Sequence, residues 1–204
     1  MLNSLRDLVY TPCCRSCQKI GSHVCSTCLT QLNLISRRDI PNVTLAVSAS
    51  SYTGWVRDAV IDLKEGRRNS QLALGSVLAR LISELAIENL CMVPVPSSPA
   101  KLRARGFNPV REVMKSADQS VASRLGISDL LGLTREPVES VGLSRRDRWR
   151  NVEGIFVALR PVPPIVVVVD DVITTGSTLR AAAQALKHGG AQEVFALALC
   201  GSGN

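Results

Sequence analysis

Aromatic side chains are scarce in this chain, which has two Trp, two Tyr and three Phe among 204 residues. The seven are scattered along the sequence. A protein that binds single-stranded nucleic acid by base stacking needs aromatic side chains interleaved with basic ones. The scarcity therefore counts against a dedicated stacking platform, although it does not exclude binding through phosphates.

Long apolar runs are also missing. A transmembrane helix needs about 20 consecutive apolar residues, and the longest apolar stretch here falls far short of that. Near the N-terminus, Arg6 and Asp7 interrupt the only stretch that resembles a signal sequence. We expect a soluble, cytoplasmic protein with no membrane span.

Acidic residues are the minority charge, with 17 Asp and Glu against 24 Lys and Arg, which gives a net charge of +7. Arginine supplies 19 of the 24 basic residues. Its rigid fork of donors matches phosphate oxygens, so this excess suits phosphorylated ligands or nucleic acid. A solvated basic face would give the same count.

Strand and helix patterns alternate along the chain, which predicts an α/β fold built on a parallel sheet. Residues 165–169 are all β-branched, and a strand without polar alternation is buried on both faces in the middle of such a sheet. We expect an N-terminal helix and zinc module in residues 1–40 and an α/β domain in residues 41–204. Strands are predicted near 43–49, 91–95, 152–158, 165–169 and 193–199, and helices near 1–12, 54–64, 70–89, 109–126 and 177–187.

A polar run follows the central strand. Asp170 and Asp171 come directly after it, and residues 174–178 (Thr-Thr-Gly-Ser-Thr) lead into a helix. Ligands bind beyond the carboxyl ends of parallel strands, where N–H groups at a helix start can wrap a phosphate together with hydroxyls. Gly176 permits close backbone approach.

The two carboxylates would repel a phosphate, so they need another partner. They suit the hydroxyls of a ribose and the outer coordination of Mg²⁺. The plainer alternative is a core strand followed by an acidic turn and a Ser/Thr-capped helix.

Two basic segments accompany this run. Arg103 and Arg105 lie between the 91–95 strand and the next helix, where they would hold a diphosphate or simply face solvent. Residues 143–151, which include Arg148, form an aperiodic charged stretch typical of a mobile lid.

Four cysteines form two Cys-x-x-Cys pairs, Cys14 with Cys17 and Cys25 with Cys28. Two such turns can present four thiolates to one tetrahedral Zn²⁺, and a full set of thiolates indicates a structural site. Two disulfides are the alternative, which a reducing compartment disfavours. Cys13 competes with Cys14 as the first ligand, and His23 is a weaker substitute.

Residues 166–178 resemble the signature of the type I phosphoribosyltransferases, in which four apolar residues, two acidic ones and two apolar ones precede T-x-G-x-T or a close variant. The resemblance implies that 5-phosphoribosyl 1-diphosphate binds with Mg²⁺. Asp170 and Asp171 would hold the ribose hydroxyls. The 5-phosphate would lie within the hydroxyl-rich loop, which comprises Thr174, Thr175, Gly176, Ser177 and Thr178. We expect Asp170, Asp171 and Arg105 to be the catalytic residues, and Arg103, Arg105 and Arg148 to bind the diphosphate.

Several motifs together resemble the ComF/GntX family of competence proteins. In chain order they are the four-cysteine cluster, Lys64-x-Gly66-Arg67, Val93 to Pro96, Arg105 to Asn108, Gly142 to Arg148 with Asn151, and the phosphoribosyl loop. The family implies a zinc module on a phosphoribosyltransferase fold and a link to DNA uptake.

Two functions follow from these observations. The first is Mg²⁺-dependent transfer of phosphoribose to an acceptor. The alternative is a non-catalytic module that senses the sugar diphosphate or handles single-stranded DNA, with a DNA-uptake protein as a partner of the zinc module. The acidic pair favours the enzyme, because carboxylates repel a phosphate backbone unless ribose and metal are present.

Overall fold

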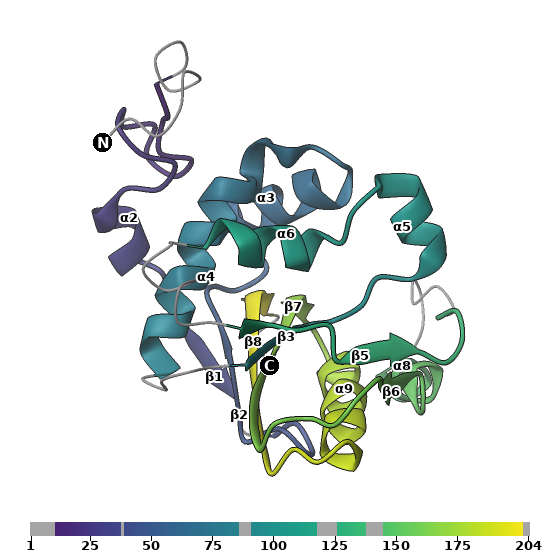
Figure 1. Ribbon diagram of the computed structural model, residues 1–204. Helices are drawn as coiled ribbons and strands as arrows, with labels where there is room; N and C mark the ends of the chain where they lie inside the picture. The colour runs from purple at the N-terminus through teal and green to yellow at the C-terminus, as the bar shows by residue number, and fades with distance from the viewer. Residues whose placement is uncertain (1–10, 38, 86–90, 118–125, 138–144, 202–204) are drawn as a thin grey trace.

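The computed structural model describes residues 11–37, 39–85, 91–117, 126–137 and 145–201 (Figure 1). A six-stranded sheet forms the centre, in the order β1-β2-β8-β7-β3-β4, and all its strands are parallel except β1. A separate antiparallel pair is formed by β5 and β6. The strands are β1 (Ile35–Arg37), β2 (Leu45–Ser48), β3 (Cys91–Pro94), β4 (Gly126–Ile127), β5 (Leu131–Leu133), β6 (Phe156–Ala158), β7 (Ile165–Ile173) and β8 (Glu193–Gly201). The helices are α2 (Ser26–Thr30), α3 (Gly54–Lys64), α4 (Gln71–Leu85), α5 (Pro99–Arg105), α6 (Pro109–Ser116), α8 (Arg145–Val152) and α9 (Ser177–His188), with the 3₁₀ helix η1 (Arg68–Ser70).

Helices cover both faces of the sheet, which confirms the predicted α/β class (Figure 1). On one face α3, α4 and α6 pack against Val167 and Val169 of β7. On the other face α9 packs against Val166 and Val168. Because alternate residues of a strand point to opposite faces, the unbroken valine run supplies both cores at once.

The central strand is longer than predicted. β7 pairs with β8 from Ile165 to Ile173, so Asp170 and Asp171 lie within the strand rather than after it. The apolar run ends at Val169, but a backbone ladder does not require apolar side chains. The acidic pair is therefore held by regular hydrogen bonding near the carboxyl edge of the sheet.

Three local predictions were wrong. The helix that starts at Pro109 ends at Ser116, and Gly126 lies in β4 instead of ending that helix. Arg103 and Arg105 belong to α5 rather than to a loop. The strand expected near 152–158 is limited to β6, because Val152 ends α8.

Other predictions fall partly outside the described ranges. Residues 1–10, which hold most of the predicted N-terminal helix, lie outside them, as do Leu143 and Ser144 of the charged stretch. The rest of that stretch forms α8. Within the described part of the chain, helices are too short or too polar to cross a membrane.

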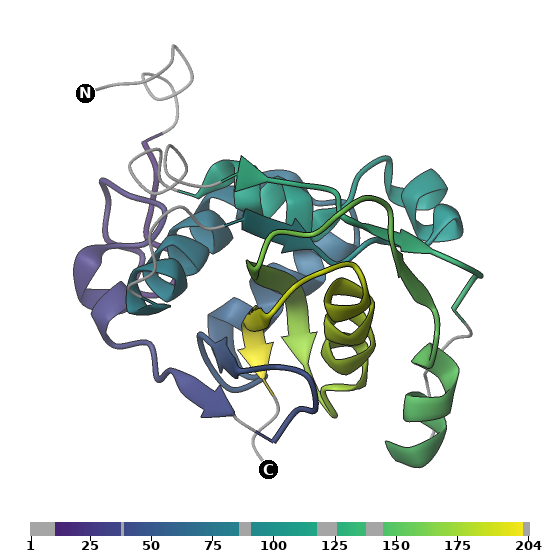
Figure 2. The ribbon, with the colours of Figure 1, turned by 60° about the horizontal axis from the view of Figure 1, so that its bottom comes forward.

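The four-cysteine region and α8 lie at opposite ends of the molecule (Figure 2). The strand β1, which falls within the predicted 1–40 module, pairs with β2 and so forms one edge of the main sheet.

Candidate functional site

The turn between β7 and α9 has a backbone that only glycine adopts readily. Gly176 is buried and left-handed, with φ of +75°. A Cβ at this position would lie 2.8 Å from Cδ1 of Ile40. Because Gly176 is also the N-cap residue of α9, the N-cap position has no side chain that could accept from the first-turn N–H groups. This end of α9 can therefore receive an anion at close range.

Hydroxyls converge on the same turn. The Oγ1 of Thr175 lies 3.0 Å from Oγ of Ser177 and accepts a hydrogen bond from its N–H at 3.4 Å. Thr174 is exposed, whereas Thr175 and Thr178 are half-buried. Residues 174–176 thus form the turn, and Ser177 and Thr178 begin α9, so hydroxyl-bearing residues lie on both sides of Gly176.

Asp170 is partly buried below this turn. Its Oδ1 accepts a hydrogen bond from the N–H of Asp171 at 2.8 Å. Burial, together with the neighbouring charge of Asp171, raises the pKa of Asp170 to about 7. Because this pKa lies close to neutrality, a hydrogen-bond donor or a cation bound next to Asp170 would shift the carboxyl strongly toward its ionised form.

Asp171 pairs with a residue that the sequence analysis did not assign to the site. Nζ of Lys64, the last residue of α3, lies 2.8 Å from Oδ1 of Asp171. Burial alone would lower the pKa of Lys64, but Asp171 and Asp170 outweigh it and the pKa is raised. Lys64 therefore stays an ammonium ion that balances the acidic pair. The sequence signal that could have assigned Lys64 to the site is its position in the Lys64-x-Gly66-Arg67 motif.

A second unpredicted residue holds the start of the turn. Nη1 of Arg37 donates to the backbone oxygen of Thr174 at 2.9 Å, and the same guanidinium pairs with Asp39. Arg37 lies on β1, 137 residues from Thr174 in sequence. Arg37 is followed directly by Arg38 and Asp39, and this short charged segment carries no pattern that would reveal the contact with Thr174.

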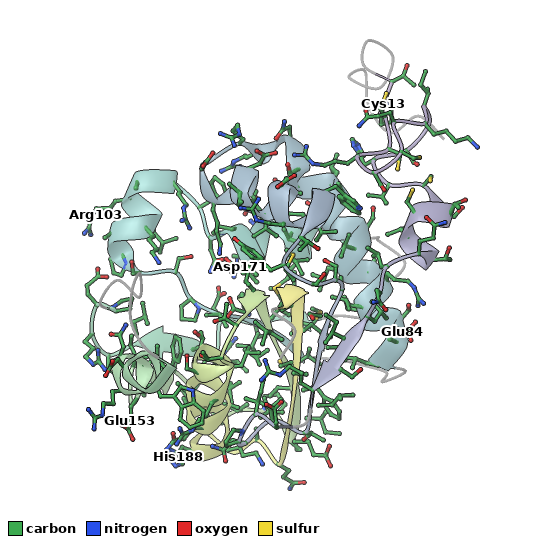
Figure 3. All side chains as sticks on the ribbon, turned by 180° about the vertical axis from the view of Figure 1, so that it is seen from behind. Cys13, Glu84, Arg103, Glu153, Asp171 and His188 are labelled. Atoms are coloured by element: carbon green, nitrogen blue, oxygen red, sulfur yellow. The ribbon has the colours of Figure 1, made fainter. Side chains whose placement is uncertain are left out.

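The three arginines that are predicted to bind the diphosphate lie in different surroundings. Arg103 is exposed on α5 and points away from Asp171 (Figure 3), while Arg105, the last residue of α5, is half-buried. Lys101 on the same helix contributes a positive charge that lowers the pKa of Asp170. The structure thus brings Lys101 into electrostatic range of the acidic pair, whereas Arg103 lies at the periphery.

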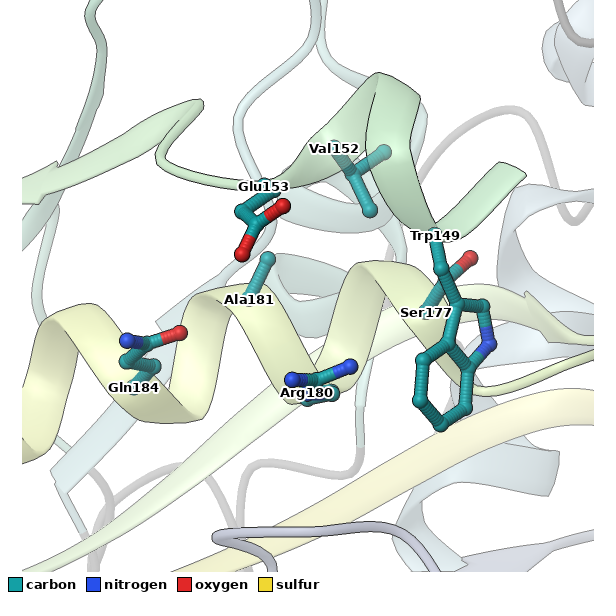
Figure 4. Close-up of a pocket in the computed structure, with 7 residues that line it drawn as sticks. All are labelled: Trp149, Val152, Glu153, Ser177, Arg180, Ala181 and Gln184. Carbon is teal, nitrogen blue, oxygen red and sulfur yellow. The ribbon is translucent and has the colours of Figure 1, made fainter. Parts of the chain in front are cut away.

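Arg148 belongs to α8, and its side chain lies outside what the structure describes. The helix itself packs along α9, where Trp149 stacks over the guanidinium of Arg180 at 4.5 Å from the ring centre (Figure 4). Ser177 lines the same small pocket. The charged stretch is therefore anchored beside the first turn of α9.

The four predicted cysteine ligands come together. The Sγ atoms of Cys14, Cys17, Cys25 and Cys28 all lie within 4.8 Å of one another, and those of Cys17 and Cys25 are 3.7 Å apart. Tetrahedral Zn–S bonds of about 2.3 Å place sulfurs about 3.8 Å apart, whereas a disulfide requires about 2.05 Å. The cluster could hold a zinc ion, and its four cysteines are free thiols.

The structure distinguishes Cys14 from Cys13. Cys13 is exposed, and its Sγ lies 3.8 Å from the backbone oxygen of Thr11. Cys14 is buried and accepts a hydrogen bond from the N–H of Cys25 at 3.4 Å. Burial alone would raise the pKa of Cys14, but backbone N–H donors outweigh it and lower this pKa to about 6. The buried thiol is thus prepared for the thiolate form that a metal requires.

Comparison with known proteins agrees with this geometry. The model of the phosphoribosyl transferase domain matches residues 164–204, which contain β7, the turn, α9 and β8. Together with the mostly parallel sheet, this match defines a phosphoribosyltransferase-type protein.

The relatives cover more of the chain. It is 34% identical over 167 residues to the DNA utilization protein YhgH of Salmonella typhi, which corresponds to 76% of this chain and 70% of that protein. The protein of the same name from Escherichia coli O6:H1 is 32% identical over 162 residues, with the same coverage. The chain belongs to the ComF/GntX family.

Proposed function

We propose that this protein binds 5-phosphoribosyl 1-diphosphate with Mg²⁺ and transfers its phosphoribosyl group to an acceptor. The observation that supports this most directly is the left-handed turn at Gly176, which joins the acidic pair to the hydroxyl-rich start of α9. A phosphate needs the donors at the start of α9, and the ribose that carries it needs the carboxylates of the acidic pair next to them.

Each residue has a role in this proposal. The loop of residues 174–178 encloses the 5-phosphate through N–H and hydroxyl donors. Asp170 and Asp171 accept hydrogen bonds from the ribose hydroxyls. Arg105 and Arg148 bind the diphosphate, whereas Arg103, which points away from Asp171, does not contact it in this arrangement.

The transfer itself needs no nucleophilic side chain. The bond between the anomeric carbon and the diphosphate oxygen breaks, the electron pair leaves with the diphosphate, and the acceptor forms the new bond at that carbon. Positive charge must stabilise the departing diphosphate. Mg²⁺ bound with the substrate would supply part of that charge, and the carboxylates of Asp170 and Asp171 would provide oxygen acceptors for its outer coordination.

We also propose that the four-cysteine cluster binds one structural Zn²⁺. All four thiolates would be ligands, which leaves no open coordination position for chemistry. In this view the cysteine region of the predicted 1–40 module docks on α3 and α4 of the 41–204 domain, while β1 belongs to the main sheet.

Calorimetric titration with the sugar diphosphate tests the binding step. We expect binding that requires Mg²⁺ and that is lost in the Asp170→Asn/Asp171→Asn double variant. Asp58→Asn is a matched control, because Asp58 is an exposed aspartate on α3. Diphosphate release across candidate acceptors then tests transfer. Equal release by the wild type and the double variant would rule out catalysis at this site.

A second candidate function is the handling of single-stranded DNA, alone or with a DNA-uptake partner. Two observations favour it: the relatives are named DNA utilization proteins, and arginine dominates the positive charge. Binding through phosphates should weaken steeply as salt rises. An affinity for a single strand that stays flat between low and physiological salt would exclude this mode.

A further inference from the structure

The four-cysteine cluster is connected to the main domain by a charged contact. Arg15 lies between Cys14 and Cys17, and its Nη2 forms an ion pair with Oδ2 of Asp62 on α3. The two side chains are 28% and 17% exposed, so the pair is largely shielded from water. A partly buried pair of this kind holds its partners in position more firmly than a surface pair does.

Asp62 is the centre of a wider network. Its Oδ1 accepts from Nε and Nη2 of Arg67 at 3.0 and 2.6 Å, and its Oδ2 accepts from Oγ of Ser70 at 3.1 Å as well as from Arg15. These donors lower the pKa of Asp62, with the Arg67 hydrogen bonds as the largest cause. The carboxylate thus fixes the turn that connects α3 to α4.

The same helical turn carries Lys64. Residues 62 and 64 are about 200° apart around a helix axis, so their side chains point to nearly opposite sides of α3. Asp62 contacts the cysteine module on one side, and Lys64 contacts Asp171 on the other. The last turn of α3 therefore lies between the four-cysteine cluster and the acidic pair.

Apolar packing restricts this arrangement further. Cys14, Val24 and Cys28 form a buried cluster with Ala73 of α4, and Trp55 of α3 packs against it. The module cannot rotate without disturbing both helices. Because Cys14 is buried in this apolar cluster, the position from which the adjacent Arg15 reaches Asp62 is also restricted.

We infer that Arg15 is a positioning residue for the phosphoribosyl site, and that the metal-filled cysteine cluster orients Lys64 against Asp171 through Arg15 and Asp62. This inference rests on the proposed function. It assigns the cysteine module a role in ligand binding at the carboxyl edge of the sheet.

The decisive variant is Arg15→Ala, because it removes the contact without removing a metal ligand. We expect it to retain its zinc and to bind the sugar diphosphate with Mg²⁺ about 2- to 30-fold more weakly, the usual range of coupling through such networks. Arg80→Ala is the matched control, since Arg80 forms an i,i+4 ion pair with Glu84 on α4. It should bind like the wild type. Unchanged affinity in Arg15→Ala would overturn the inference.

Hydrogen exchange without any ligand separates this inference from the proposed function. We expect Arg15→Ala to exchange faster than the wild type at residues 60–71 and at Asp171, with Arg80→Ala unchanged there. If the wild type fails to bind the sugar diphosphate, the proposed function fails, but faster exchange at these residues still supports the connection. Unchanged exchange overturns it. Arg15→Gln, which keeps a long polar side chain but removes the charge that pairs with Asp62, replaces Arg15→Ala in both measurements, with the same expected results, if the alanine variant does not fold.

Discussion

Gly176 and Gly106 adopt nearly the same left-handed backbone, with φ of +75° and +76°, but in different surroundings. A Cβ at 106 would meet open space, whereas a Cβ at 176 would lie 2.8 Å from Ile40. The backbone strain of an alanine costs about 1 kcal/mol at either site. We expect Gly176→Ala to lower the free energy of unfolding by about 1–3 kcal/mol more than Gly106→Ala, because overpacking adds to the strain.

Urea denaturation of both variants measures this difference. Adding Ile40→Ala to Gly176→Ala should recover part of the loss, and a double-mutant cycle isolates the recovered part. Equal losses at the two glycines would show that the Ile40 contact is relieved at little cost.

Asp170 makes the stability of the protein depend on pH. Its folded pKa of about 7 exceeds the value of about 4 in an unfolded chain. Between these values the folded state keeps a proton that the unfolded chain has released, so stability falls as pH rises through the window. Since Asp170 retains some exposure, we expect Asp170→Asn to raise the free energy of unfolding by about 2 kcal/mol at pH 8, and by little near pH 4.

Urea midpoints of the wild type and Asp170→Asn between pH 4 and 8 provide the measurement. Asp58→Asn removes an exposed carboxylate of α3 and should show no such trend. If the gain from Asp170→Asn were the same at both ends of the range, ionisation of Asp170 would not be its cause.

Among single residues, the sequence predicts a place in the candidate site only for those that belong to one local pattern. Asp170, Asp171 and the 174–178 run form a single strand–turn–helix signature. Lys64 lies in a recognised motif, but its partner Asp171 is more than 100 residues away. Such long-range pairs depend on how the sheet assembles, and one sequence alone does not contain that information.

Helices α5 and α6 begin in the same way, with a capping side chain followed by proline. Oγ of Ser98 accepts from the N–H of Lys101, and Oδ1 of Asn108 accepts from the N–H of Arg111. The sequence predicts only the second of these two helices, since α5 has only seven residues and none of them is buried. Short exposed helices lack the apolar periodicity on which prediction depends.

The two caps differ in one bond. Nδ2 of Asn108 also donates to the backbone oxygen of Val95 at 2.9 Å, whereas Ser98 acts as a cap with a single 3.3 Å hydrogen bond. A lost cap costs about 1 kcal/mol. We expect Asn108→Ala to reduce the free energy of unfolding by about 1 kcal/mol more than Ser98→Ala, because it also leaves the Val95 oxygen without this donor.

Chemical denaturation of the two alanine variants tests this expectation. Asn108→Asp keeps the acceptor and loses the donor, so it should fall between the wild type and Asn108→Ala. A larger loss for Ser98→Ala than for Asn108→Ala would contradict the expectation.

The whole molecule joins two parts that differ in how they are stabilised. The sheet and its helices bury two apolar cores. The cysteine module has a much smaller buried cluster, whose members include Cys14, Cys28 and Ala73 of α4. The spacing of the cysteines predicts the cluster, but only the fold shows that the module shares its apolar contacts with α3 and α4.

This shared packing predicts how metal binding affects stability. We expect one Zn²⁺ per chain in the wild type and in Cys13→Ser, and loss of most of the metal in Cys14→Ser, because Cys14 faces the cluster and Cys13 does not. Binding to the folded state alone stabilises it, so Cys14→Ser should lower the Tm of the entire chain in one transition. Metal analysis and thermal unfolding measure both effects. An early transition of the module alone, followed by main-domain unfolding at the wild-type Tm, would show that the module and the main domain are energetically independent.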